Sequence, residues 1–344
     1  AFQLVFFSVL FGFPLVTLLL IRERQPGHLR PIHPWWTALR TISAVITGAF
    51  DDWPAMERWS LDYLADAMGD AKISVNVTPD GRGDALLSTD GWTVSGLGDN
   101  EMPGEVFVQP EEREMTLREF ATMLATPTED PDANAHASRR PAVPYVSRQC
   151  GSLLEEFPSL VDDCADEIPF ASQALGKRPD AVNLWIGDER SQTTFHRDHY
   201  ENVYCVVRGV KVFHLLPPCD GRVLGYADAP AARFEQKLVA GENRFVLALE
   251  RPRRTVAWAS ATPASLRALA RTNPRDAVVP IVVEVEAGEA LYLPAMWYHH
   301  VEQRRDGGGE PAVAVIAETR AIAEDAAELV LVDWNEKPPV ADML

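Results

Sequence analysis

Four residues of this chain have the types and spacing of metal ligands. His196 and Asp198 stand two residues apart, and His299 and His300 are adjacent much further along the chain. Side chains two apart on a strand share a face, whereas adjacent side chains face opposite ways. His196 and Asp198 can therefore point together, and at most one histidine of the later pair can join them. Two imidazoles and one carboxylate form a facial triad that leaves positions open on Fe(II). Alone, the His196/Asp198 pair is a weak signal, since a polar surface turn has the same pattern.

Lys211 is a second candidate, because it interrupts an apolar run. Arg208-Gly209 has the composition of a hairpin turn, which predicts that Val203–Val207 and Val210–Leu216 pair with each other. Lys211 then shares a face with apolar residues, and a buried ammonium requires an anion. The distal carboxylate of 2-oxoglutarate is a suitable anion. The alternative is a lysine near a hairpin end whose ammonium extends into water.

The elements that must position these residues are short strands separated by turns. Many short strands at close spacing predict a β-barrel or sandwich. The strand candidates are Pro144–Ser147, Ala181–Ile186, Val203–Val207, Val210–Leu216, Ile281–Val285, Ala290–Leu293 and Ala312–Ile316. Helices are expected at Gly151–Cys164 and Ala264–Arg271. Before them we expect strands at Thr41–Thr47 and Ala71–Val77, and helices that begin after Ser60 and at Thr116.

Composition narrows the class of partner. The chain has 344 residues and a formal net charge of −18, which opposes contact with phosphate backbones and disfavours direct nucleic-acid binding. A basic protein or peptide is easier to accommodate, although the acidity also serves plain solubility. The four cysteines form no CxxC pair, which favours a reducing compartment and a cytoplasmic or nuclear location.

The first 21 residues contain no charged side chain and are followed by Arg22-Glu23-Arg24. Such a segment is long enough to cross a bilayer and would leave the catalytic domain facing the cytosol. The alternatives are a packed helix or an artefactual segment. The expected division is 1–21 as this hydrophobic segment, 22–143 as an α/β extension, 144–320 as the catalytic domain and 321–344 as a short tail.

Two segments carry a family resemblance. PDAVNLWIG at 179–187 and HRDHYENVYC at 196–205 closely resemble the JmjC protein hydroxylases related to the asparaginyl hydroxylase that inhibits hypoxia-inducible factor. The resemblance covers roughly residues 40–316. It implies a mainly β protein with helical decoration, a double-stranded β-helix of the jelly-roll or cupin type. It also implies Fe(II), 2-oxoglutarate and O2 as reactants. The implied iron ligands are His196, Asp198 and His299, and the implied 2-oxoglutarate contacts are Lys211, Tyr145, Thr193 and Asn202.

The function that the resemblance implies is hydroxylation of a protein side chain, with a lysine of a translation-associated GTPase as the expected target. A JmjC lysine demethylase and a histone-tail peptidase are alternatives, although no nucleophile–base pair is evident for the second. A non-catalytic cupin-like binding protein is a third alternative. It draws support from one departure: Ala314 stands where the family has Asn. The short tail leaves a homodimer an open question.

Overall fold

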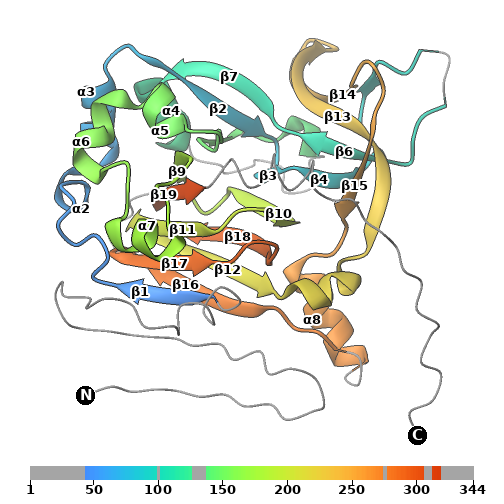
Figure 1. Cartoon of the computed structure of the whole chain (residues 1–344). Coiled ribbons are helices and arrows are strands. Elements are labelled where there is room, and N and C mark those ends of the chain that lie inside the picture. Colours follow the sequence, from blue (N-terminus) through green and yellow to red (C-terminus); the bar gives the residue numbers. More distant parts are fainter. Residues whose placement is uncertain (1–42, 99–100, 126–136, 274–276, 306–311, 319–344) are drawn as a thin grey trace, which may run out of the picture.

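The computed structural model describes residues 43–98, 101–125, 137–273, 277–305 and 312–318. Its centre is a pair of five-stranded sheets (Figure 1). The first sheet has the order β1 (Ala44–Thr47), β17 (Glu289–Leu293), β11 (Asn202–Arg208), β19 (Ala312–Glu318) and β9 (Ala181–Gly187). The second has the order β16 (Ile281–Glu286), β12 (Val210–Leu216), β18 (Tyr298–Arg304), β10 (Gln192–Arg197) and β3 (Arg82–Gly83).

The two sheets pack through apolar residues that alternate along their strands. In β16, Val283 and Val285 are buried, whereas Glu284 and Glu286 are exposed. One core cluster takes residues from both sheets, including strands β9, β11 and β17 of the first and β12, β16 and β18 of the second. This arrangement confirms the jelly-roll fold that the sequence predicted.

A second set of sheets covers one end of this barrel. A six-stranded sheet contains β4 (Ala85–Ser88), β6 (Glu105–Gln109), β13 (Tyr226–Val239), β14 (Glu242–Leu249), β5 (Val94–Ser95) and β15 (Thr255–Ala259). A three-stranded sheet contains β7 (Glu111–Thr116), β2 (Lys72–Thr78) and β8 (Val143–Tyr145). Strand β1 precedes residue 143 yet belongs to the barrel, and β13 follows it yet pairs with β6. Strands from both sides of residue 143 therefore share sheets, and the division into domains stays a prediction.

Helices gather at the left of Figure 1, against β9 and the three-stranded sheet. They are α2 (Ala55–Arg58), α3 (Leu61–Met68), α4 (Leu117–Ala125), α5 (Ser152–Glu156), α6 (Val161–Cys164) and α7 (Pro169–Leu175), with the 3-10 turn η2 (Pro158–Leu160). The 3-10 turn η1 (Ala137–Arg139) contacts β14 of the six-stranded sheet instead. At the opposite end lie η3 (Pro218–Leu224) and α8 (Pro263–Thr272). Two predicted helix starts are confirmed: the Ser60 side chain accepts from the Tyr63 N–H, and Thr116 with Glu119 forms a capping box.

Two expectations about local structure were wrong. Val203–Val207 and Val210–Leu216 do not form a hairpin, because β11 pairs with β17 and β19 while β12 pairs with β16 and β18. Gly209, with φ of +70°, instead turns the chain from one sheet into the other. The helix expected over Gly151–Cys164 is broken into α5, η2 and α6, because Pro158 cannot continue the hydrogen bonding of a helix.

All four cysteines are free thiols, and Cys205 is a buried core residue as expected. In the part of the chain that is described, no helix has the length and apolar character needed to cross a membrane. The segments 1–21 and 321–344 lie outside the described residues. The expected strand at Ala312–Ile316 is confirmed as β19, in which Ala314 pairs with Trp185 of β9.

Candidate metal centre

The predicted ligands converge where β10 and β18 lie side by side. His196 is near the end of β10, Asp198 is the first residue after that strand, and His299 is on β18. The antiparallel register places His196 directly opposite His299. A backbone hydrogen bond joins the residues next to the two strands: the Met296 N–H, just before β18, donates to the Asp198 carbonyl oxygen, just after β10, at 2.7 Å.

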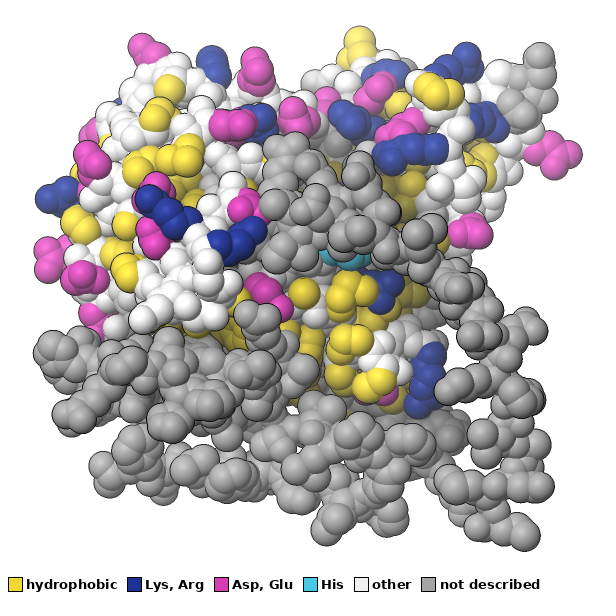
Figure 2. All heavy atoms as spheres, in the orientation of Figure 1, with side chains coloured by type: hydrophobic (Ala, Val, Ile, Leu, Met, Phe, Trp, Pro, Cys, Tyr) yellow, Lys and Arg dark blue, Asp and Glu magenta, His cyan; other side chains and the backbone are white. Residues whose placement is uncertain are grey.

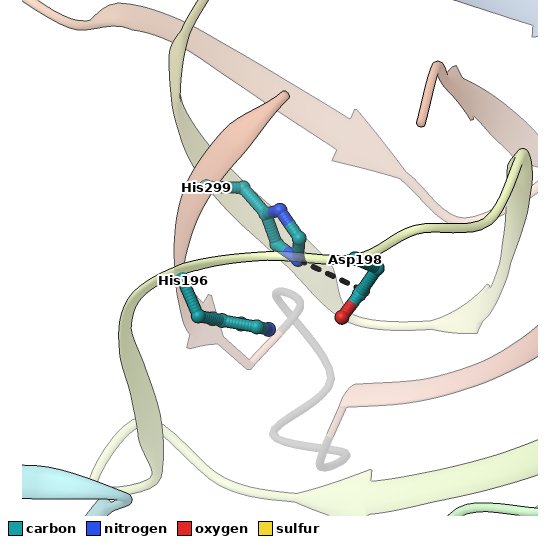
Figure 3. Close-up of side chains that lie close together, drawn as sticks. All are labelled: His196, Asp198 and His299. Carbon is teal, nitrogen blue, oxygen red and sulfur yellow. Dashed lines mark ion pairs between the residues drawn. The ribbon is translucent and has the colours of Figure 1, made fainter. Parts of the chain in front are cut away.

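The three side chains point toward one another (Figure 3). One ligand atom from each lies within 4.8 Å of the other two. His299 Nε2 is 3.5 Å from Asp198 Oδ2, and the centroids of the His196 and His299 rings are 4.1 Å apart. Within the described residues, this is the one group of histidine, cysteine and acidic side chains with a metal-binding arrangement.

Both imidazoles are held in the tautomer that metal binding needs. His196 Nδ1 lies 2.8 Å from the Thr194 carbonyl, and His299 Nδ1 lies 3.1 Å from the Trp297 carbonyl. A carbonyl oxygen only accepts, so each Nδ1 carries the proton and each Nε2 presents a lone pair. His299 Nε2 is buried without a hydrogen-bond partner. Burial also lowers the pKa of His299 to about 4, which keeps its ring neutral near pH 7.

His300 faces the other side of the strand, as the alternation of side chains requires. Its ring lies 5.5 Å from the Phe195 ring, and its Nε2 is 3.2 Å from Glu302 Oε1. Of the two adjacent histidines, His299 is therefore the one that joins His196 and Asp198.

Lys211 is a buried cation without a carboxylate. Its side chain is almost fully buried, with the residue 2% exposed, so the alternative in which it extends into water was wrong. Its Nζ donates to the Tyr145 hydroxyl at 3.1 Å and to Gln303 Oε1 at 2.5 Å. Among the described residues no ion pair involves Lys211. Burial lowers its pKa to about 7, so the site favours an arriving anion.

The other predicted contacts leave polar atoms unsatisfied nearby. Thr193 Oγ1 and Asn202 Oδ1 are buried without a hydrogen-bond partner, while Asn202 Nδ2 donates to Asp198 Oδ2 at 3.4 Å. The Trp185 indole N–H is also unpartnered. Buried polar groups are ordinarily paired, so these atoms indicate a site for a polar ligand.

A cavity of about 680 Å³ lies beside the His–Asp–His set. Its lining includes His196, Asp198, Tyr145, Thr193 and Trp185. The volume lies in the range of small-ligand sites.

Two further residues of the site were not found from the sequence. Gln303, on β18, holds Lys211 and donates to the Ser191 carbonyl at 3.3 Å. Trp258, on β15, has its ring nearly parallel to the His196 ring, with the ring centroids 6.4 Å apart. Its indole N–H donates to Thr194 Oγ1 at 2.8 Å. Only the strand pairing brings Trp258 here, and nothing in its local sequence signals that role.

Comparison with known proteins identifies the family. Residues 42–317 match the profile of the cupin-like domain. The chain belongs to the cupin-like JmjC family. It is 36% identical over 281 residues to the human bifunctional peptidase and (3S)-lysyl hydroxylase JMJD7, and this match covers 82% of this chain and 79% of the relative. It is 35% identical over 273 residues to the Arabidopsis thaliana lysine-specific demethylase JMJ32, covering 77% of this chain and 72% of the relative. It is 32% identical over 272 residues to JmjC domain-containing protein E of Dictyostelium discoideum, and this match covers 75% of this chain and 72% of the relative.

The residues of this JmjC chain fit iron and 2-oxoglutarate. Two imidazole Nε2 atoms and a carboxylate match the two-histidine, one-carboxylate set of non-haem Fe(II) oxygenases. The buried Nζ of Lys211 and the neighbouring Tyr145 hydroxyl match a carboxylate that must be bound away from water.

Proposed function

We propose that this protein is an Fe(II)- and 2-oxoglutarate-dependent dioxygenase that hydroxylates a lysyl side chain of a protein. One observation carries the proposal: the cavity beside the His–Asp–His set is lined by His196, Asp198 and Tyr145, and the Tyr145 hydroxyl accepts a hydrogen bond from the buried, anion-free Lys211. A metal-binding cupin without a dicarboxylate co-substrate has no need of a buried cation, which is costly without an anion.

The residues have separate tasks in this reaction. Bound iron and 2-oxoglutarate supply the oxidising chemistry. His196, Asp198 and His299 fix the position of the metal, and the Thr194 and Trp297 carbonyls fix the two rings. Lys211 binds the far carboxylate of the co-substrate, and Gln303 and Tyr145 hold its ammonium in place. The aromatic walls at Trp185 and Trp258 limit the access of water.

Two observations support a basic protein as the substrate. Two relatives that share more than three quarters of this chain have names that refer to lysine chemistry, a lysyl hydroxylase and a lysine-specific demethylase. The chain also has a net charge of −18, which attracts basic segments. We propose a translation-associated GTPase as the class of substrate protein, on the strength of the family resemblance.

The test measures succinate formation and oxygen transfer by the purified full chain with Fe(II) and 2-oxoglutarate. Wild-type protein is expected to form succinate and to add one oxygen to lysine-containing peptides, detected by mass spectrometry. Asp198→Ala should abolish both. Asp228→Ala, which removes an exposed carboxylate on β13, is the matched control and should retain both. Absence of succinate with iron-loaded wild-type protein would favour the non-catalytic alternative.

Demethylation is a second candidate, because the Arabidopsis relative is a lysine-specific demethylase by name. Removal of an N-methyl group releases formaldehyde, whereas carbon hydroxylation does not. Formaldehyde release from methyl-lysine peptides, without a stable gain of one oxygen, would favour the demethylase.

A further inference from the structure

Asp84 lies beside the metal centre, although its part of the sequence is far from the ligands. It follows β3, which pairs in parallel with β10 so that Gly83 stands opposite Thr193. The Thr194 hydroxyl donates to the Asp84 carbonyl. Asp84 lines the cavity that also contains His196, and the two groups interact electrostatically.

The turn before β3 fixes this position. Thr78 Oγ1 accepts from the Gly81 N–H at 2.8 Å, and the Gly81 carbonyl accepts from the Gln192 N–H at 2.9 Å. Gly81 has φ of +82°, and a Cβ there would lie 1.7 Å from the Arg190 carbonyl oxygen. Only glycine allows the loop to approach β10 this closely. Asp84 itself has φ of +50°, in the left-handed region.

The carboxyl group of Asp84 is incompletely satisfied. Its Oδ1 is buried and has no hydrogen-bond partner. Gln109 hydrogen-bonds to the group, and among the described residues no ion pair involves it. Arg233 and Arg254 interact with it electrostatically, and Arg254 is engaged by Glu250 and Gln109. Burial raises the pKa of Asp84, although the nearby His196, Arg233 and Arg254 act to lower it.

The aromatic residues near Asp84 can contact the methylene groups of a lysine as well as its ammonium. Trp258 and Tyr226 line the same cavity, and Trp258 packs against Phe107 with ring centroids 4.9 Å apart. Aromatic faces cover methylene groups and also attract an ammonium. The single unpartnered oxygen fits a point donor such as an ammonium, whereas a guanidinium bonds best when both carboxylate oxygens are available.

On the face seen in Figure 2, acidic and basic side chains intermingle. We propose that Asp84 is the substrate-specificity residue of this enzyme, accepting a hydrogen bond from the ammonium of the target lysine through Oδ1. This inference rests on the proposed lysyl hydroxylation and names the group that selects the lysine.

The experiment compares short synthetic peptides with a central lysine, norleucine or arginine between randomised flanks. Norleucine keeps an apolar stem without the charge. Oxygen incorporation with Fe(II) and 2-oxoglutarate gives kcat/KM for each pool. Wild-type protein should prefer lysine over norleucine by about 10- to 100-fold, the range of a charge-assisted hydrogen bond. Asp84→Asn should lose that preference, and Asp84→Glu should retain part of it.

Glu105→Gln is the matched control, because it removes an exposed carboxylate from the neighbouring strand β6. It should keep the wild-type preference. Equal kcat/KM of wild-type protein for lysine and norleucine overturns the role of Asp84 without any variant. An unchanged preference in Asp84→Asn also overturns it, while lysyl hydroxylation stands. If wild-type protein forms succinate but adds oxygen to no lysine peptide, the proposed function fails and this inference fails with it.

Discussion

The binding of 2-oxoglutarate should weaken as the pH rises through neutrality, because the charge that binds it titrates there. Burial lowers the pKa of Lys211 from 10.5 to about 7, so the ammonium is mostly charged at pH 6 and mostly neutral at pH 8. An anion binds the charged form, so binding above this pKa takes up one proton. The KM for 2-oxoglutarate should therefore rise about tenfold between pH 6 and pH 8.

The other groups around Lys211 do not titrate in this window. Gln303 has no ionisable group, and burial raises the pKa of Tyr145 far above neutrality. His299 stays neutral, since its pKa is lowered to about 4. The two groups that contact the Lys211 Nζ therefore keep their charge over this range.

The assay is succinate formation at several 2-oxoglutarate concentrations, repeated at each pH with saturating iron. Lys211→Arg is the matched variant, because a guanidinium stays charged throughout this range. Its KM should be higher than the wild-type value and should not vary with pH. A wild-type KM that is the same at pH 6 and pH 8 would refute the idea that a neutralised Lys211 limits binding.

Three further outcomes are expected. His299→Ala should reduce metal content and lower succinate formation by more than about 100-fold, measured by elemental analysis and turnover; normal metal content would contradict its assignment as a ligand. Gly81→Ala should lower the free energy of unfolding in urea by about 2 to 4 kcal/mol, because its Cβ would meet the Arg190 carbonyl; an unchanged midpoint would show that the loop moves freely. Asp163→Ala should lower the free energy of unfolding in urea by about 3 kcal/mol, because it leaves the Trp59 indole N–H and the Tyr63 hydroxyl without their acceptor. In that variant the KM for 2-oxoglutarate should stay at the wild-type value.

The convergence of His196, Asp198 and one later histidine was predictable from strand geometry, and the family resemblance singled out His299. Alternation along a strand limits the later pair to one ligand, and the structure places His299 opposite His196 in the register of β10 and β18. Lys211 was a candidate for a related reason, since a charged side chain inside an apolar run must either be buried with the run or extend its charge into water. Both arguments need only the local period of a strand.

Other parts of the site depend on pairing that local patterns do not encode. Trp258 reaches His196 because β15 pairs with β13, a strand rich in alanine and containing Pro230. Such a composition has low strand propensity, and tertiary pairing overrides it. The hairpin error at Gly209 has the same origin, because a turn within one sheet and a turn between two sheets have similar sequences. Asp84 was missed since only the pairing of β3 with β10 places it in the cavity.

The position of β19 has a consequence for how the protein is made. This strand lies between β11 and β9, so it supplies the hydrogen-bonding partner on one side of each. A growing chain exposes both unpaired strand edges until Ala312–Glu318 has left the ribosome, and exposed edges promote aggregation. We therefore expect chaperone dependence during synthesis, and we expect truncations before Ala312 to be insoluble even though they retain all three proposed iron ligands.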